Sequence, residues 1–217
     1  MKNRVPLGMT PAAFLSRFWQ KKPLLVRGAL PDFRDPLSPD QLAGLACEEG
    51  VESRLVDSKT WRVRFGPQNE KTLRALPKTR WTLLVQELQR FVPEAAALLD
   101  AFSFLPNHRI DDVMVSFAPK DGSVGAHDDS YDVFLLQGQG RRRWQIDARK
   151  NRDKSLRNGL DLKILKHFEP QQDWTLSRGD LLYLPPGVAH HGTAIDDCLT
   201  YSIGFRAPNR GELWREL

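Results

Sequence analysis

Residues 179–190 read Gly-Asp-Leu-Leu-Tyr-Leu-Pro-Pro-Gly-Val-Ala-His and do most to decide the fold. The apolar run at 181–184 predicts a short buried strand, and Pro185, Pro186 and Gly187 predict a sharp turn directly after it. His190 follows that turn. The segment therefore brings one histidine next to a buried strand.

A second motif, His127-Asp128-Asp129, supplies partners for His190. Side chains at positions i and i+2 of a strand point to the same face, so His127 and Asp129 can both project inward while Asp128 points away. Two imidazoles and one carboxylate form the three-ligand set typical of non-haem iron(II) oxygenases. A structural zinc site normally has four ligands, whereas three leave positions open for water, a co-substrate or oxygen. The other interpretation is that both histidines are hydrogen-bonded residues of the core.

The chain from residue 110 onward is a series of short apolar segments separated by glycine and proline. Residues 112–117 alternate, with Val113, Val115 and Phe117 on one face and Met114 and Ser116 on the other, which could line a pocket. Further strands are predicted at 131–137, 142–146, 174–176, 181–184 and 199–205, and the first two of these form a hairpin around the turn at 138–140. So many short strands predict a mainly β jelly roll, or double-stranded β-helix, with a cavity between its two sheets.

The N-terminal half mixes helices with strands. Thr10 and Pro11 predict the start of one helix, and Ser38 with Gln41 predicts a capping box at the start of another. Apolar residues at helical spacing predict a further helical block at 79–91 that resumes after Pro93 to 101. Short strands are predicted at 24–26, 51–56 and 61–65. We therefore expect an α+β protein in three parts: an N-terminal elaboration at 1–105, a jelly-roll core at 106–206 and the start of a C-terminal helix at 207–217.

Composition argues against several classes of protein. With 217 residues, 41% of them apolar, the chain is long enough to bury a core. It has no apolar run of about 18 residues that could cross a membrane. Its first residues lack the apolar region of a secretory signal, so we expect a cytoplasmic protein. The two cysteines, Cys47 and Cys198, have no CxxC spacing and argue against a disulfide scaffold.

The charge of the chain is mildly basic. Its net charge is +5, from 32 Lys and Arg against 27 Asp and Glu, and the basic residues gather at 141–143 and 149–157. We interpret both stretches as solvated loop faces, because no RNA-recognition motif or helix-turn-helix signature accompanies them. Direct sequence-specific binding of nucleic acid is therefore not expected.

Five segments carry a resemblance to a known family. They begin at Arg109, Val124, Gln137, Gly179 and Tyr201, and they read Arg-Ile-Asp-Asp-Val-Met-Val-Ser-Phe, Val-Gly-Ala-His-Asp-Asp-Ser-Tyr-Asp-Val-Phe, Gln-Gly-Gln-Gly-Arg-Arg-Arg-Trp, Gly-Asp-Leu-Leu-Tyr-Leu-Pro-Pro-Gly and Tyr-Ser-Ile-Gly-Phe-Arg-Ala-Pro. Together with Phe-Trp-Gln-Lys-Lys-Pro-Leu near the N-terminus, they spread over almost the whole chain. The sequence resembles the JmjC-domain cupins, and among them the YcfD-like bacterial ribosomal oxygenases.

The resemblance implies an iron(II)- and 2-oxoglutarate-dependent dioxygenase that uses O2 to hydroxylate a protein side chain. The substrate it implies is an arginine of a large-subunit ribosomal protein, so the enzyme would act close to the ribosome. The Fe(II) ligands, which are also the catalytic residues, would be His127, Asp129 and His190. Arg142 matches the basic residue that holds the distal carboxylate of 2-oxoglutarate, a role that suits the two parallel hydrogen bonds of a guanidinium. Ser116 matches a hydroxyl position near the co-substrate or the substrate, and we assign it to co-substrate binding.

Two residues are assigned to the substrate side of the site. Tyr131 shares the strand face of His127 and Asp129 and is expected to border the site. Asp132 is expected to meet a cationic substrate. His108, His167 and His191 have no ligand-spaced partner or point away, and they are not assigned to the metal.

Two other functions stay open. The chain could be a metal-dependent cupin enzyme that does not use 2-oxoglutarate, or a non-catalytic basic module that binds the ribosome or RNA and keeps a metal for stability. Full-length members of the resembling group continue past the last matching segment into a helical dimerisation region and a further domain. This sequence ends at Leu217, so dimerisation through that region is not expected of these residues.

Overall fold

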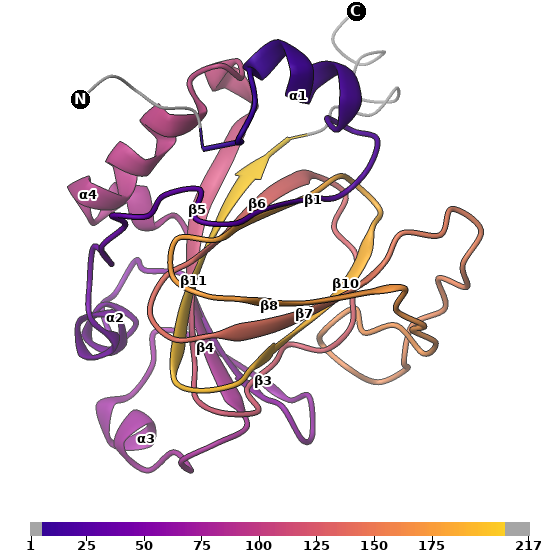
Figure 1. Ribbon diagram of the computed structural model, residues 1–217. Coiled ribbons are helices and arrows are strands. Elements are labelled where there is room, and N and C mark those ends of the chain that lie inside the picture. The colour runs from indigo at the N-terminus through magenta and orange to yellow at the C-terminus, as the bar shows by residue number, and fades with distance from the viewer. Residues whose placement is uncertain (1–5, 207–217) are drawn as a thin grey trace, which may run out of the picture.

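The computed structural model describes residues 6–206, which form two antiparallel sheets that face each other (Figure 1). The larger sheet has eight strands in the order β1-β9-β6-β11-β5-β4-β2-β3, and the smaller has three in the order β10-β7-β8. The larger sheet consists of β1 (Leu24–Val26), β2 (Ser53–Asp57), β3 (Val63–Phe65), β4 (Trp81–Val85), β5 (Ile110–Ala118), β6 (Asp132–Gln137), β9 (Leu181–Leu184) and β11 (Cys198–Phe205). The smaller sheet consists of β7 (Arg142–Asp147), β8 (Gln172–Leu176) and β10 (Ala189–Ala194).

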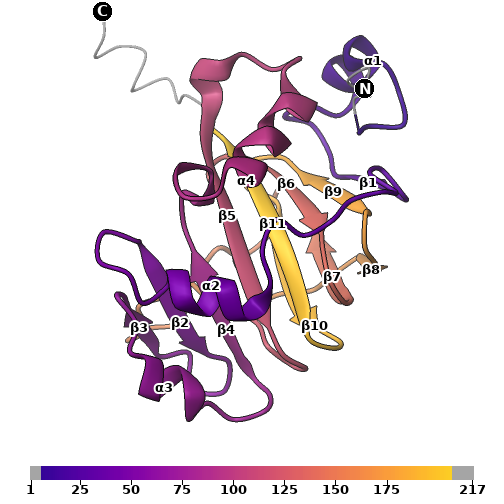
Figure 2. The same cartoon turned by 90° about the vertical axis from the view of Figure 1, so that its left-hand side faces the viewer.

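Short helices cover the outer face of the larger sheet, on the side away from the smaller one (Figure 2). Apolar side chains such as Phe14 and Leu42 anchor them, because both are fully buried in the cluster beneath the helices. The helical segments are α1 (Pro11–Arg17), α2 (Pro39–Leu45), α3 (Glu70–Arg74) and α4 (Pro93–Ala96), with 3-10 turns η1 (Leu88–Arg90), η2 (Ala97–Phe102) and η3 (Asn107–Arg109).

Strand β6 shows how the layers are built, because it is buried on both faces. Phe134 and Leu136 point into the cluster under the helices, whereas Val133 and Leu135 pack between the sheets against Trp144 of β7. Successive side chains of a strand alternate between faces, so one strand can contribute to two separate cores. The space between the sheets is thus the interior in which a site can form.

The predicted alternation in β5 is confirmed. Val113 and Val115 are fully buried in the helix-side cluster, while Met114 lines a cavity on the opposite face. The predicted helix starts are also confirmed. The Thr10 side chain accepts a hydrogen bond from the N–H of Ala13, and Ser38 with Gln41 forms a capping box.

The helix predicted over 79–91 is wrong, because residues Trp81–Val85 form strand β4 and only Leu88–Arg90 make a 3-10 turn. Strand β4 pairs with β2 on one side and β5 on the other, and it is buried from Thr82 to Val85. A strand buried on both faces presents a continuous apolar run, which periodicity alone does not distinguish from a helix. Pairing with both neighbours decides the conformation here.

The hairpin predicted for 131–146 is also wrong. Both strands exist, but β6 lies in the larger sheet and β7 in the smaller one, so the turn at 138–140 crosses from one sheet to the other. The turn after β9 does the same, because β9 pairs with β6 and β10 pairs with β7. These two crossings bring Arg142 and His190 into the smaller sheet, facing the larger one.

The first strand of the chain completes an edge of the larger sheet. Leu24 of β1 pairs with Tyr183 of β9, far along the sequence, and Leu25 pairs with Leu182. Four strands of the predicted 1–105 segment thus share a sheet with strands of the 106–206 segment. The division of the chain at these boundaries stays a prediction, and the helix expected after residue 206 lies outside the described residues. Between residues 6 and 206, none of the helices is both long and apolar enough to cross a membrane.

Candidate metal centre and co-substrate pocket

The structure brings His127, Asp129 and His190 together, with one possible ligand atom of each within 4.8 Å of the others. His127 and His190 form an isolated antiparallel bridge, in which each backbone N–H donates to the carbonyl of the other at 3.0 and 2.8 Å. Their rings lie 4.3 Å apart. Asp129 reaches both, with a carboxylate oxygen 3.6 Å from Nε2 of His190 and another 4.0 Å from Nε2 of His127.

Both imidazoles are oriented by the turns that carry them. Nδ1 of His127 lies 3.0 Å from the carbonyl oxygen of Gly125, and Nδ1 of His190 lies 3.0 Å from that of Val188. A histidine that donates its Nδ1 proton to a carbonyl presents an unprotonated Nε2, which is the arrangement usual in metal sites. Both Nε2 atoms turn toward Asp129, so the donor set fits a divalent cation.

Burial keeps His190 in the form that binds metals. Burial first, and then the neighbouring His127, lower the pKa of His190 to about 4. The side chain is therefore a neutral imidazole at pH 7, ready to donate a nitrogen lone pair without first losing a proton.

Arg142 is a buried cation without an anionic partner. The residue is only 5% exposed, and its Nη1 donates to the hydroxyl of Ser116 at 3.0 Å and to that of Thr200 at 3.4 Å. No carboxylate lies within ion-pair distance among the residues that the structure describes, and Nε has no hydrogen-bond partner there. A buried guanidinium is costly unless a charge compensates it. This environment fits a carboxylate ligand.

A second donor without a partner lies beside Arg142. The guanidinium carbon of Arg142 is 5.6 Å from the ring centre of Trp144, and that ring is 5.7 Å from the ring of His190. Within residues 6–206, Nε1 of Trp144 is buried and makes no hydrogen bond. Trp144 thus lies between the predicted co-substrate residue and a predicted metal ligand, so the unsatisfied donors and the triad belong to one site.

A cavity of about 550 Å³ opens beside the triad and is lined by both His127 and Asp129. Met114 of β5 and Ser202 of β11 line it and are register partners. The next pair on the same face, Ser116 and Thr200, holds Arg142. The cavity lining and the Arg142 pocket therefore follow one another along β5 and β11.

Carboxylates dominate the lining of this cavity. Its charged residues are Glu52, Arg54, Glu87, Asp111, Asp112, Asp128, Asp129, Asp161, Lys163 and Arg206. Asp112 accepts a hydrogen bond from the N–H of Glu87 at 3.3 Å, and burial first, followed by the charges of Asp111 and Glu87, raises its pKa to about 6. Glu87 has a left-handed backbone with φ 49°, which is strained for a residue other than glycine. A cationic side chain would relieve the repulsion among these acids.

A family model for the JmjC domain matches residues 97–213. This chain belongs to the JmjC-domain family. The two facing sheets are therefore those of a JmjC fold, and the predicted cupin jelly roll is confirmed.

Relatives with assigned names extend this likeness. "Ribosomal protein uL16 3-hydroxylase" of Escherichia coli strain K12 is 46% identical over 202 residues, covering 92% of this chain and 53% of that protein. "Probable ribosomal oxygenase" of Haemophilus influenzae is 42% identical over 213 residues, covering 96% of this chain and 52% of that protein. The structure of the E. coli ribosomal oxygenase YcfD with cobalt and 2-oxoglutarate matches with a TM-score of 0.84 at 43% identity, covering 96% of this chain and 55% of that one. The JmjC chain thus spans about half the length of the curated relatives it matches.

The structure separates the two residues predicted on the substrate side of the JmjC site. Tyr131 lines the cavity, and burial first, then the charge of Asp129, raises its pKa far above the usual value, so its hydroxyl stays protonated. Asp132 does not line the cavity, and its prediction as a substrate contact is wrong. It is fully buried on the helix side, where Tyr183 and Gln20 donate hydrogen bonds to it. It shares a face with Phe134, whereas Val133 on the other face lines the cavity.

The remaining histidines lie away from the triad, in agreement with their lack of assignment. His191 points to the opposite face of β10, with Nε2 2.9 Å from the hydroxyl of Ser123. His167 is exposed and lies 3.7 Å from Asp153, and His108 is exposed on the turn before β5.

Three residues of the site escaped the sequence prediction. Asp112 could have been found, because it precedes Met114 and Ser116 on the alternating face of β5. Thr200 was not predictable from the sequence, since its place opposite Ser116 depends on strand register. Arg152 was assigned to a solvated loop with its basic neighbours, yet its side chain is only 2% exposed and contacts Asp128. No periodicity marks it within that basic stretch.

Proposed function

We propose that this chain is an iron(II)- and 2-oxoglutarate-dependent oxygenase that hydroxylates a side chain of a ribosomal protein. The observation that carries the proposal is the buried guanidinium of Arg142, which lacks an anion and lies one aromatic ring from the metal-ligand triad. In the overall reaction, O2, 2-oxoglutarate and a substrate C–H bond give succinate, CO2 and an alcohol. One atom of O2 enters succinate and the other enters the substrate.

The donor set supports iron as the resident metal. Two imidazoles and a carboxylate are the facial ligands of non-haem iron(II) oxygenases, and three protein ligands leave coordination positions for the co-substrate and O2. When bound, the iron supplies the activation of O2 and the oxidation of the C–H bond. The contribution of His127, Asp129 and His190 is to fix the metal on one side of the cavity.

The pocket around Arg142 supports 2-oxoglutarate as co-substrate. A guanidinium can bind a carboxylate through two parallel hydrogen bonds, and the Ser116 and Thr200 hydroxyls already fix one nitrogen of Arg142. Nε1 of Trp144 offers another donor. A dicarboxylic acid with one end at Arg142 would extend its other end past Trp144 toward the metal. The structure of YcfD was determined with 2-oxoglutarate and cobalt.

The acidic cavity supports a cationic substrate side chain. Asp112 and its carboxylate neighbours line the cavity that also contains Asp129, and Tyr131 adds a protonated hydroxyl there. A guanidinium entering this cavity would compensate charges that are now only partly paired. We therefore propose an arginine as the hydroxylated residue. The name of the E. coli relative directs the proposal to ribosomal protein uL16 and hence to the cytoplasm, close to the ribosome.

Succinate formation and mass spectrometry of ribosomal proteins test this function. We expect the chain, loaded with Fe(II), to form succinate from 2-oxoglutarate under air and to add one oxygen atom to an arginine of uL16. His127→Ala and Asp129→Ala should abolish both products, because each removes one of three ligands. His167→Ala is the matched control, since that histidine is exposed and apart from the triad. Metal-loaded wild-type protein that yields neither product would contradict the proposal.

The same assay separates the rival functions. Turnover that Arg142→Ala leaves unchanged would favour a metal-dependent reaction without 2-oxoglutarate. A non-catalytic RNA-binding module is less well supported, because half of the basic side chains in the two basic stretches are ion-paired. Arg141 pairs with Asp196, Arg143 with Asp173, and Arg149 with Asp147 and Glu169.

A further inference from the structure

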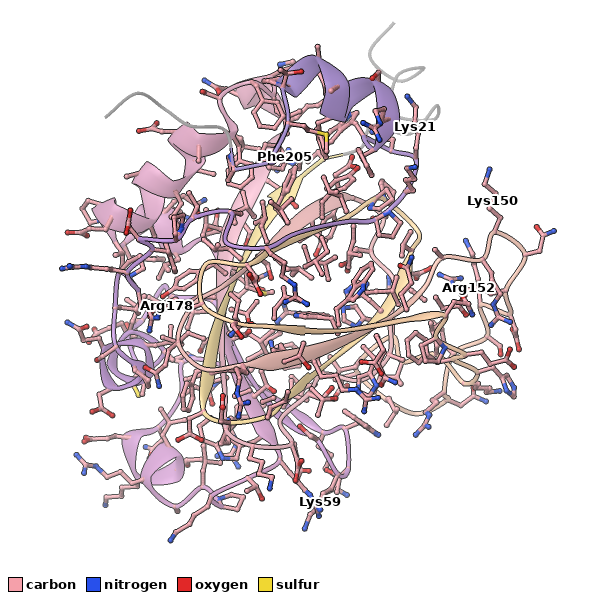
Figure 3. All side chains as sticks on the ribbon, in the orientation of Figure 1. Lys21, Lys59, Lys150, Arg152, Arg178 and Phe205 are labelled. Atoms are coloured by element: carbon pink, nitrogen blue, oxygen red, sulfur yellow. The ribbon has the colours of Figure 1, made fainter. Side chains whose placement is uncertain are left out.

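The loop between β7 and β8 carries one arginine whose surroundings differ from those of its basic neighbours. The Arg152 side chain is only 2% exposed, whereas that of Arg149 is 44% exposed. Figure 3 shows Arg152 close to the barrel and Lys150 at the outer edge of the same loop. An arginine side chain is almost never fully buried unless it is paired with another group. The burial of Arg152 therefore points to a role at the barrel surface.

Arg152 joins the two turns that carry the metal ligands. Its Nη2 donates to the carboxylate of Asp128 and, at 2.9 Å, to the carbonyl oxygen of Gly187. Asp128 lies between His127 and Asp129 in the sequence, and Gly187 lies in the turn that leads to His190. The N–H of Gly187 also donates to the backbone carbonyl of Asp129 at 2.7 Å. One guanidinium nitrogen thus connects the segment of two ligands with the segment of the third.

The rest of the Arg152 side chain argues against a role in stability alone. Across residues 6–206, its Nε and Nη1 find no hydrogen-bond partner, although both are buried. Buried donors without partners destabilise a fold, so these two nitrogens reduce what Arg152 contributes to stability. The backbone already attaches the loop, because the N–H of Leu165 donates to the carbonyl of Ala126 at 2.8 Å.

We propose that Arg152 is a positioning residue for the metal centre, holding Asp128 and Gly187 so that Asp129 and His190 keep their facial arrangement. This inference rests on the proposed metal site and adds a residue to it. Groups that orient metal ligands without touching the metal typically affect metal affinity or activity by about 10- to 100-fold. Asp128 was expected to point away from the site, but it lines the cavity and is the residue through which Arg152 acts on the triad.

Arg149 provides a matched control in the same loop. It also forms ion pairs, with Asp147 and Glu169 at the two ends of the loop, and neither ion pair includes a residue of the two turns that Arg152 joins. Arg149→Gln therefore removes one cation and its ion pairs from the loop without changing the surroundings of the triad. If loop attachment alone matters, Arg149→Gln and Arg152→Gln should affect the metal to a similar degree.

The test is a Co(II) titration of the metal-free full chain, followed by the visible absorption of the bound ion, which reports ligand geometry. We expect Arg152→Gln to weaken Co(II) binding by about 10- to 100-fold and to alter the absorption bands. Arg149→Gln should leave affinity and bands close to those of the wild type. Wild-type affinity and bands in Arg152→Gln would overturn the inference while leaving the proposed function intact. If the wild-type protein binds no Co(II), the proposed metal site itself would be contradicted.

A double variant separates positioning from folding. Arg152→Gln alone leaves the Asp128 charge uncompensated, so it could lower stability for that reason. Arg152→Gln combined with Asp128→Asn removes both charges, and its melting temperature in the metal-free state reports folding directly. We expect this variant to melt close to the wild type and still bind Co(II) weakly with altered bands. A stable double variant with wild-type affinity and bands would show that the ion pair does not position the ligands.

Discussion

Arg142 and Arg152 are both buried, yet their surroundings are opposite. Arg142, in the smaller sheet, faces two hydroxyls and has no carboxylate in range among the described residues, whereas Arg152, in the following loop, lies against the carboxylate of Asp128. A buried cation without an anion leaves a place for an anionic ligand, and a buried cation with an anion connects two parts of the fold. Burial alone therefore does not assign a function to an arginine; its partners do.

The largest expected effect concerns the co-substrate. Arg142→Met should raise the KM for 2-oxoglutarate by about 100-fold, because truncating one partner of a buried charge pair typically costs about 2–5 kcal/mol. Co(II) affinity should stay close to that of the wild type, since Arg142 contacts no triad residue. Succinate formation at varied 2-oxoglutarate concentration measures the KM, and titration with Co(II) measures the metal affinity. Arg143→Gln is the control, because this neighbour points outward and pairs with Asp173. A KM for 2-oxoglutarate in Arg142→Met as low as that of the control would show that Arg142 does not bind the co-substrate.

Thermal stabilisation by 2-oxoglutarate tests the role of Arg142 without requiring turnover. At about 100 times its dissociation constant, 2-oxoglutarate should stabilise Co(II)-loaded wild-type protein by about 2.7 kcal/mol. For a chain of this length that corresponds to a rise of roughly 5–10 °C in melting temperature. Arg142→Met should show almost no rise, whereas Arg149→Gln should keep it. A full rise in Arg142→Met would mean that another residue binds the co-substrate.

The two arginines should also differ in the sign of their effect on folding. In the metal-free protein, Arg152→Met should lower the free energy of unfolding by about 2 kcal/mol, because it leaves Asp128 without its partner. Arg142→Met should leave that free energy unchanged or raise it, since it removes an uncompensated buried charge. Urea unfolding followed by fluorescence measures both. Equal losses in the two variants would contradict the comparison.

The smallest expected effect concerns Asp112, a half-buried acid of the cavity lining. Its pKa of about 6 means that about a tenth of the carboxylate is ionised at pH 5, so the KM for an arginine-containing substrate should rise about tenfold between pH 7 and pH 5. Asp112→Asn should show a high KM that lacks this component of the pH dependence. Steady-state kinetics of both proteins at pH 7 and pH 5 measure this difference. The same change in KM with pH in the wild type and in Asp112→Asn would mean that Asp112 has no part in substrate binding.

The same carboxylate has a consequence for stability. Its pKa in the folded protein is raised above the value of about 3.9 in the unfolded chain, so folding favours the protonated form. Its contribution to stability is therefore fully present below about pH 4 and is lost as the pH rises through about 6. Asp112→Asn should stabilise the protein at pH 7 more than at pH 4, as measured by urea unfolding.

The strength of the sequence prediction varied with the range of the interactions involved. The triad was predictable because His127 and Asp129 have strand spacing and His190 follows a distinctive turn. The helix starts were predictable because a capping residue such as Ser38 bonds to a residue only three positions away. The resemblance supplied Arg142. The place of these residues relative to one another depends on sheet pairing, which no local pattern contains.

The errors have the same origin. Trp81–Val85 is a strand because β2 and β5 pair with it, and β6 and β7 are separated because a turn crosses between sheets. Asp132 was placed on the substrate side together with Tyr131, although neighbouring side chains of an extended segment point to opposite faces, and it is buried on the helix side. Arg152 lies in a loop without periodicity, where only the contacts of the folded chain distinguish a buried cation from an exposed one.

Pairing between β1 and β9 has a consequence for the newly made chain. Leu24 is synthesised well before its partner Tyr183, which lies 159 residues further along the chain. Until then β1 has no strand beside it, and unpaired edges of growing sheets are sites of aggregation. His190 follows Tyr183 closely, so the third metal ligand and the partner strand of β1 emerge almost together. We therefore expect the nascent chain to remain without a complete metal site, and in need of protection by chaperones, until synthesis of the jelly roll is nearly finished.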